Sequence, residues 1–184
     1  MDLDKTIKER RSIRKFKSSS PDWRDIIECI DTMRYAPMAG NNFSIKTILV
    51  DEEEKIQELA EAAQQPFVGQ AKYIVVVCTT STRTETSYGE KGTNYLKQQA
   101  GAAIQNFLLK ITEKKLATCW VGYFSEKEVK RILDIPEEIH VEALFPIGYA
   151  LQKPELKRKL ELDAFLYFNT YGNKKMNKIQ KIDV

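Results

Sequence analysis

The sequence has few cysteines and almost no histidine, and these shortages remove several kinds of site. Its 184 residues contain three cysteines, Cys29, Cys78 and Cys119, and one histidine, His140. The cysteines are widely spaced and odd in number, so we expect neither a disulfide framework nor a CxxC zinc site. A Ser-His-Asp site could be built only around His140. We therefore expect no metal site and no catalytic side chain.

The short motifs that mark several common enzyme classes are missing as well. The sequence contains no GxGxxG dinucleotide loop, no Walker phosphate loop and no HExxH zinc motif. It has no long apolar run, and it begins Met-Asp-Leu-Asp-Lys. We therefore expect no signal peptide and no membrane helix, and we predict a cytoplasmic protein.

Neither sign of charge is in large excess, because 29 basic and 26 acidic residues give a net charge of only +3. That value does not indicate general nucleic-acid binding. The length suits one domain with its own hydrophobic core. We predict a single domain over residues 1–184, in which about 152–184 form a C-terminal arm rich in lysines and aromatics, with little periodicity.

Apolar periodicity predicts an alternation of helices and strands. A helix should start at Ser20-Pro21-Asp22, with the Ser20 hydroxyl as its cap and Pro21 in the first turn. Its buried face should consist of Ile26, Ile27, Ile30 and Met33. Further helices are expected at 53–63, 93–115 and after a capping box at 125–128, and strands at 45–50, 73–78 and 141–150. The continuous apolar run 73–78 is typical of a strand buried on both faces.

The predicted helix over residues 93–115 is the longest element. Small residues occupy 100–103 and let another backbone approach closely. The helix could form the centre of the domain or a dimer interface, although an ordinary buried helix would carry the same pattern. The side expected to be buried carries these residues: Leu96, Ala100, Ala103, Ile104, Phe107, Leu108 and Ile111.

A cluster of cations near the start of the chain suits a phosphate group. Arg10, Arg11 and Arg14 lie within five residues, and Ser12 stands between them. Guanidinium groups match phosphate oxygens two at a time, and a serine hydroxyl adds a neutral donor. The alternative is a solvated basic turn on the surface.

Two further segments are candidates for ligand contact. Residues 34–42 contain a proline, a glycine and two asparagines, which indicates a turn-forming loop. The apolar run 118–123 contains Gly122, where backbone can approach a ligand closely. A catalytic role for Cys119 has little support, because nothing in the sequence shows a group that would activate the thiol.

Five segments, taken together, resemble the FMN-dependent nitroreductase family. They are residues 10–16, 36–41, 105–109, 118–122 and 146–149, and they follow one another in the family's order. The resemblance implies an α+β fold with a mostly antiparallel central sheet flanked by helices. It also implies an intertwined homodimer in which the C-terminal arms are exchanged.

The resemblance assigns FMN contacts to several groups of residues. The arginine cluster would hold the phosphate, and the loop 34–42 would reach the flavin ring from the second subunit. The turn at Gly122 would offer backbone N–H groups to the ring. Arg158, or Lys157 in its place, would add a second phosphate contact. The predicted FMN-binding residues are Arg10, Arg11, Ser12, Arg14, Pro37, Met38, Ala39, Asn41, Val121, Gly122, Tyr123 and Arg158.

The sequence departs from the family pattern at several of these positions. Met38 stands where the family often has serine, and residues 43–45 replace a Gln-Pro-Trp-like run. The family's basic-Pro-Leu pattern near Arg158 is broken. Gln99 occupies a position that is often acidic, and we interpret it, with Gln105 and Asn106, as structural.

The function implied by the resemblance is hydride transfer through FMN. NAD(P)H would reduce flavin N5, and an electron-poor small molecule such as a nitroaromatic or a quinone would then be reduced in a ping-pong reaction. The alternatives are a specialised relative such as a reductive dehalogenase, a flavin carrier without turnover, and a nucleic-acid-binding protein using the basic ends. We expect a homodimer without nucleic-acid or membrane partners, and the sequence leaves the choice between NADH and NADPH open.

Overall fold

The chain forms two compact units in a computed structural model that describes residues 2–80, 82–152, 154–155 and 157–176. The first unit, here called the body, is Met1–Pro154, and the second, the tail, is Glu155–Val184. The division lies close to residue 152, where the sequence predicts the start of an arm. A single domain over the whole chain stays a prediction.

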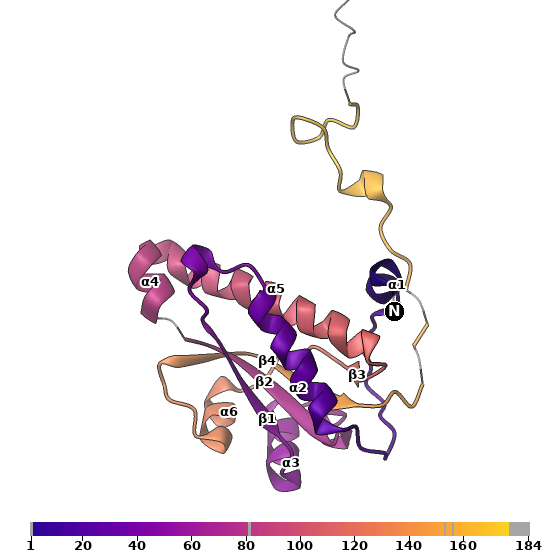
Figure 1. Cartoon of the computed structure of the whole chain (residues 1–184), viewed down its shortest axis with the longest axis vertical. Helices are drawn as coiled ribbons and strands as arrows, with labels where there is room; N and C mark the ends of the chain where they lie inside the picture. The colour runs from indigo at the N-terminus through magenta and orange to yellow at the C-terminus, as the bar shows by residue number, and fades with distance from the viewer. Residues whose placement is uncertain (1, 81, 153, 156, 177–184) are drawn as a thin grey trace, which may run out of the picture. The chain divides into compact units, whose positions relative to one another are not determined.

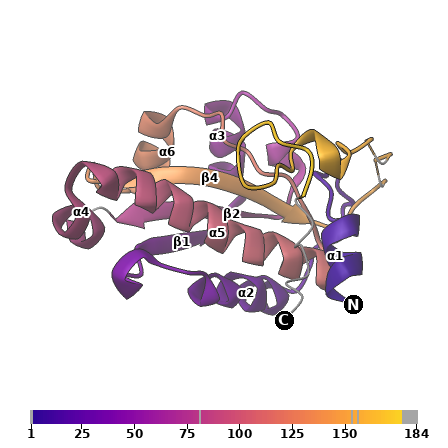
Figure 2. The same cartoon turned by 90° about the horizontal axis from the view of Figure 1, so that it is seen from above.

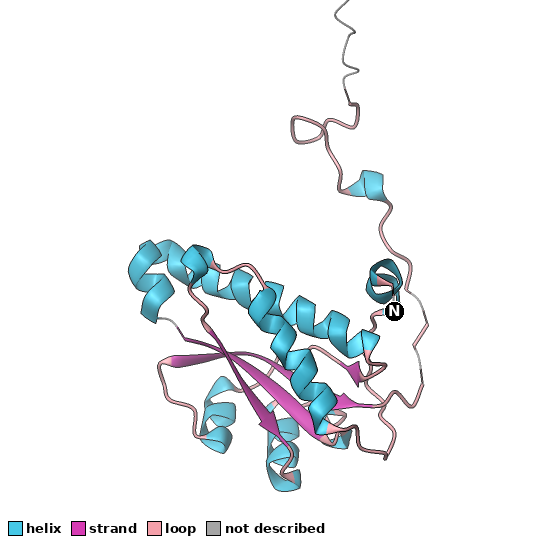
Figure 3. Cartoon of the chain, in the orientation of Figure 1, coloured by secondary structure: helices cyan, strands magenta, loops and turns pink. Residues whose placement is uncertain are grey.

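The body is built on one four-stranded antiparallel sheet (Figure 1, Figure 3). The strands are β1 (Ile45–Val50), β2 (Tyr73–Thr80), β3 (Ala117–Thr118) and β4 (Ile139–Gly148), in the order β1-β2-β4-β3. The prediction of an α+β fold with a mostly antiparallel sheet is confirmed. Residues 74–79 of β2 are buried, which also confirms a strand covered on both faces.

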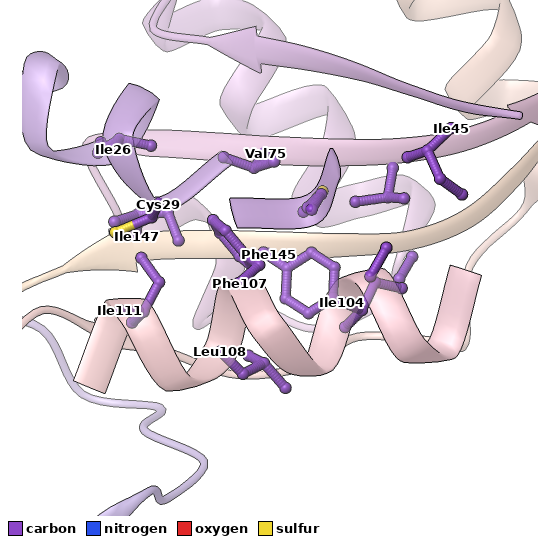
Figure 4. Packing of buried hydrophobic residues seen from close by; sticks show 14 of the residues in the cluster. Ile26, Cys29, Ile45, Val75, Ile104, Phe107, Leu108, Ile111, Phe145 and Ile147 are labelled. Atoms are coloured by element: carbon purple, nitrogen blue, oxygen red, sulfur yellow. The ribbon is translucent and has the colours of Figure 1, made fainter. Parts of the chain in front are cut away.

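Helices cover both faces of this sheet (Figure 1, Figure 2). The helix α5 packs with α2 on one face, where Phe107 meets Phe145 edge-to-face at 5.4 Å between ring centroids (Figure 4). On the other face α3 and α6 bury Leu59 and Val129 against Leu144. The helices of the body are α1 (Leu3–Glu9), α2 (Trp23–Asp31), α3 (Glu53–Ala62), α4 (Thr82–Tyr88), α5 (Gly92–Glu113) and α6 (Glu126–Leu133).

The start and the buried face of α2 differ from the prediction. The cap is Asp22, whose Oδ1 accepts the Arg24 N–H at 2.9 Å, so the predicted cap at Ser20 is wrong. Ile27, which was predicted on the buried face, is 44% exposed, and Cys29 is buried there instead. A helix turns 100° per residue, so position 29, three residues after Ile26, lies closer to its face than position 27 does.

The long helix α5 follows the prediction closely. All seven apolar side chains expected on its inner side are buried, and Gln99 is buried with them. Gly101 points away from the core, since a Cβ added there would meet no atom within 4 Å in the described residues. The predicted serine cap of α6 is confirmed, because Ser125 Oγ accepts the Glu128 N–H at 3.4 Å. The reciprocal half of the capping box is not formed, because the Ser125 N–H donates to the Ala62 carbonyl at 2.8 Å and the Glu128 carboxylate pairs with Arg131.

The segment that follows α1 runs in extended conformation beside the end of the sheet. The Ile13 N–H donates to the Thr118 carbonyl at 2.9 Å, and Phe16 pairs with Ala150 as an isolated bridge. Ile13 and Phe16 are buried. This anchoring fixes the position of the arginine cluster.

The described residues of the tail include a short 3₁₀ turn, Leu162–Ala164, and a turn closed by the Phe168 N–H donating to the Asn173 carbonyl at 2.8 Å. Tyr171 is 93% exposed. Burial of the tail's aromatics against a second subunit stays a prediction. In the described part of the chain, every helix is too short or too polar to cross a membrane.

Candidate functional site

The arginine cluster borders a positively charged cavity. Arg10 and Arg11 are half-buried and line a cavity of about 420 Å³ between α1 and the C-terminal half of α5. Lys5 and Lys115 add two further cations to its lining, against the single carboxylate of Glu9. This excess of positive charge favours an anionic ligand.

Arg11 also has a structural role at the end of α1. Its Nη1 donates to the carbonyl oxygens of Lys8 at 2.5 Å and Arg10 at 2.6 Å. Cations at a helix C-terminus satisfy carbonyl groups that have no partner within the helix. A guanidinium has five N–H donors, so Arg11 keeps donors for a ligand while it caps the helix.

Ser12 and Arg14 lie outside this cavity. Both are exposed, whereas Ile13 and Phe16 of the same segment are buried. The guanidinium carbon of Arg14 lies 5.8 Å from the ring centroid of Phe67. The cluster is therefore divided, with Arg10 and Arg11 in the cavity and Ser12 and Arg14 on the outer surface.

The turn at Gly122 is hydrogen-bonded to β4 through Val121, and its next two residues are exposed to solvent. Val121 is buried and exchanges two backbone hydrogen bonds of 3.0 Å with Leu144 of β4. Gly122 and Tyr123 are exposed. A Cβ at Gly122 would come no closer than 3.7 Å to Trp120, which is ordinary contact. The fold itself therefore does not require glycine at this position.

A second turn, at residues 64–67, contacts both Arg14 and the turn at Gly122, and the sequence did not indicate it as part of the site. Gln65 Nε2 donates to the Tyr123 carbonyl at 3.3 Å, and Phe67 lies two residues further on under Arg14. Gln64, before it, has a φ of 53°. The only sequence signal was the Gln-Gln-Pro run, which indicates a turn but names no contact.

The loop 34–42, here called the cofactor loop, lies between the end of α2 and β1. Met38 is half-buried against the core, Pro37 is exposed, and Ala39–Asn41 form a single 3₁₀ turn. Gly40 and Asn41 both have positive φ, at 58° and 54°. The exposed Pro37, Gly40 and Asn41 are available to a ligand.

Gln99 ties this loop to α5. Its Oε1 accepts the Ala39 N–H at 2.6 Å, and its Nε2 donates to Ser44 Oγ at 3.2 Å. The sequence predicts a structural role for Gln99 but does not indicate its contact with the loop. No signal in the sequence could have found this pair, because 60 residues separate the partners.

The loop and the cavity lie at different halves of α5. The loop is held at Gln99, and the cavity is lined by Leu108 and Thr112, nine and thirteen residues later. At about 1.5 Å per residue, that is about 14 to 20 Å along the helix. Figure 2 shows α4 beside one end of α5 and α1 beside the other.

Arg158 belongs to the tail. It is exposed and lines a cavity of about 490 Å³ within the tail, together with Lys159 and Glu161. Its predicted contact with the phosphate stays a prediction, as does the substitute role of Lys157.

The cysteines offer no reactive thiol. Burial raises the pKa of Cys29 to about 12 and that of Cys78 to about 11. Cys119 is 2% exposed, and its Sγ–H points to the Trp120 carbonyl at 3.7 Å. Within the described ranges, no cluster of three or more His, Cys, Asp or Glu residues could hold a metal ion.

Comparison with known proteins gives a match over most of the body. The model of the Nitroreductase family matches residues 7–67 and 60–149. These ranges include the arginine cluster, the cofactor loop and the Gly122 turn. They end before the tail.

Individual relatives cover nearly the whole chain at low identity. An iodotyrosine deiodinase of Thermotoga neapolitana is 22% identical over 191 residues, covering 89% of this chain and 96% of its own. An NADPH-flavin oxidoreductase of Vibrio harveyi is 27% identical over 188 residues, covering 97% and 78%. The solved structure of the Vibrio harveyi NADPH:FMN oxidoreductase complexed with NAD⁺ superposes with a TM-score of 0.83 at 26% identity, covering 95% and 79%.

Proposed function

Because the chain belongs to the nitroreductase family, we propose that it is an FMN-dependent oxidoreductase that uses NAD(P)H to reduce an electron-poor small molecule. The cation-lined cavity beside the arginine cluster carries this proposal, because it offers a phosphate its counter-charges within the region that matches the family. The names of the Vibrio harveyi relatives support flavin and NADPH as the partners.

The phosphate end of FMN fits the donors that the cavity supplies. Arg10 and Arg11 would bind the dianion, with Lys5 and Lys115 adding positive charge. Ser12 and Arg14 lie on the outer face of the same extended segment, where they would meet the rest of the cofactor. Arg158 of the tail would add a further contact to the phosphate.

The flavin ring would lie against the Gly122 turn. Gly122 and Tyr123 are exposed, while the bonds between Val121 and Leu144 hold the turn in place. Their backbone N–H groups would donate to the ring, and fixed donors stabilise the negative charge that reduction adds. No side chain in this arrangement has to act as an acid or a base.

The cofactor loop would come from a second copy of the chain. Within one chain, the loop and the cavity lie about 14 to 20 Å apart along α5. In a homodimer, Pro37, Met38, Ala39 and Asn41 of one subunit would complete the site of the other.

When bound, FMN supplies the hydride chemistry. The chain binds it, orients its ring and keeps one face open. NAD(P)H and the acceptor, a nitroaromatic or a quinone, would use that open face in turn, which gives ping-pong kinetics. Positioning of the two partners against the ring is the main catalytic contribution of the protein.

Anaerobic reduction tests this proposal. Protein loaded with FMN should lose its oxidised flavin absorbance when NADH or NADPH is added, and should regain it when a quinone or a nitroaromatic follows. A bound flavin that neither nucleotide reduces would identify a carrier instead and would contradict the proposed reaction.

A dehalogenase is the second candidate, because the Thermotoga neapolitana relative is named iodotyrosine deiodinase and matches 89% of the chain. Halide release from a halogenated tyrosine by the reduced protein would favour it. Reduction of quinones and nitroaromatics without halide release would favour the first proposal.

A further inference from the structure

Gln99 is a buried amide that contacts the turn of the cofactor loop and Ser44, the residue before β1. Its side chain accepts the Ala39 N–H at 2.6 Å and donates to Ser44 Oγ at 3.2 Å. Gln99 and Ser44 are each 4% exposed. One side chain on α5 thus fixes the loop at its turn and at the point where it enters β1.

The other backbone hydrogen bonds of the loop do not connect its turn to α5. The Asn41 N–H donates to the Met38 carbonyl and the Asn42 N–H to the Ala39 carbonyl, so both bonds lie within the turn. The Thr80 N–H donates to the Ser44 carbonyl at 2.9 Å and anchors only the β1 end. In the described residues, the hydrogen bond between Gln99 and Ala39 is therefore the one that ties the turn to α5, beside the packing of Met38 against the core.

A second side-chain amide on α5, that of Asn106, makes a contact that does not involve the cofactor loop. Asn106 lies seven residues after Gln99, two turns further along the helix. Its Nδ2 donates to the Thr32 carbonyl at 3.3 Å, which ties α5 to the end of α2 and not to the loop. The two amides can therefore be compared on one helix.

We propose that Gln99 is a positioning residue for the flavin: by holding the Ala39 amide, it sets the turn that carries Met38 and Asn41 at the distance needed for contact with the ring. This inference rests on the proposed flavin function. Gln99 itself touches neither cofactor nor substrate, and it acts only through the loop.

Hydrogen exchange of the full-length protein without flavin tests the positioning directly. Gln99→Leu removes the acceptor, so the Ala39 amide should exchange at least about tenfold faster, because a buried hydrogen bond to it is lost. Gln99→Glu keeps an acceptor for Ala39 and can accept from the Ser44 hydroxyl, so protection should return. Asn106→Leu should leave exchange at Ala39 unchanged.

Flavin binding then connects the loop with the site. FMN titration should give a dissociation constant about tenfold higher for Gln99→Leu than for the wild type, and close to the wild-type value for Gln99→Glu and Asn106→Leu. Should Gln99→Leu fail to fold, Ser44→Ala removes only the weaker of the two bonds. It should then show a smaller effect in the same direction.

The possible outcomes separate this inference from the function on which it rests. A wild-type protein that binds no FMN would overturn the proposed function, whereas exchange at Ala39 would still report on the loop. A wild type that binds FMN, with Gln99→Leu and Asn106→Leu equally mild in their effect on it, would overturn the role of Gln99.

Discussion

At the level of single residues, we expect Gly122 to be important for FMN binding but not for folding. An alanine Cβ there would meet Trp120 at 3.7 Å, so Gly122→Ala should leave the free energy of unfolding within about 0.5 kcal/mol of the wild type. The same methyl group would stand where the flavin ring approaches the backbone. We therefore expect weaker FMN binding at unchanged stability, measured by titration and urea unfolding. Equal FMN affinity would contradict the placement of the ring.

Arg10 and Arg11 should behave differently although both line the cavity. Arg10→Ala should weaken FMN binding by about 1.5 to 3 kcal/mol, the value of a hydrogen bond to a charged group. Arg11→Ala should weaken binding and also lower stability, because its guanidinium caps the end of α1. Flavin titration and thermal unfolding measure the two effects.

Arg24→Ala is the matched control for these variants. Arg24 is an exposed cation whose guanidinium carbon lies 4.8 Å from the centroid of its neighbour Trp23, outside the cavity. Its removal lowers the net charge by the same amount. A loss of FMN affinity equal to that of Arg10→Ala would show a general charge effect and not a phosphate site.

The buried Cys29 thiol predicts a loss of stability in alkali. Its pKa rises from 9.0 to about 12 on folding, mainly through burial, so the unfolded chain releases the proton first. The contribution of the thiol to the free energy of unfolding is complete below pH 9.0 and is lost as the pH rises towards about 12. Cys29→Ala should therefore flatten the pH dependence in this range by up to about 1.4 kcal/mol per pH unit.

Urea unfolding of the wild type and Cys29→Ala across this range measures the difference. Lys114 contributes in the same direction in both proteins, because its hydrogen bonds to Asp25 and Glu28 raise its pKa. Equal slopes for the two proteins would show that Cys29 ionises in the folded state as readily as in the unfolded chain.

At the scale of the element, the 3₁₀ turn of the cofactor loop depends on Gly40. Its φ is 58°, and a Cβ would come within 2.8 Å of the Tyr88 hydroxyl. Gly40→Ala should cost about 1 to 2 kcal/mol of stability and weaken FMN binding. Gly89→Ala is the control, because Gly89 has a φ of 56° but no described atom within 4 Å of an added Cβ. It should cost less stability and leave FMN affinity unchanged, and urea unfolding with flavin titration compares the two.

The elements themselves were largely predictable, because apolar spacing reports burial directly. The seven buried apolar positions of α5 follow from their helical period, and the burial of β2 follows from its continuous apolar run. The errors in α2 arose where local signals competed. Two neighbouring isoleucines cannot share the centre of one helical face, and Asp22 was a better-placed cap than Ser20.

The candidate site was only partly predictable. The sequence indicated the arginine cluster, the loop and the Gly122 turn, because each is a compact run of distinctive residues. It did not indicate that the cluster divides between a cavity and an outer surface, because that depends on the extended segment pairing with β3. Gln65 and Gln99 were missed as contacts because their partners lie 58 and 60 residues away.

At the scale of the whole molecule, the proposed site requires two chains. Leu3 and Ile7 lie one turn apart on α1 and are 62% and 51% exposed, so this helix, which lines the cavity through Lys5 and Glu9, also presents exposed apolar surface. We predict a dimer in sedimentation velocity, with Ile7→Glu shifting the protein to monomer and weakening FMN binding. Ile7→Leu, which keeps the surface apolar, should remain dimeric. A wild-type monomer that binds FMN tightly would contradict the shared site.

We propose above that the body holds FMN through the arginine cluster. The most direct test is the visible absorption spectrum of the purified protein, reconstituted with FMN and freed of excess, beside that of Arg10→Ala. We predict a flavin spectrum for the wild type, release of FMN on denaturation, and loss of most of the bound flavin in the variant. A wild-type protein that stays colourless after reconstitution would show that the body does not bind FMN.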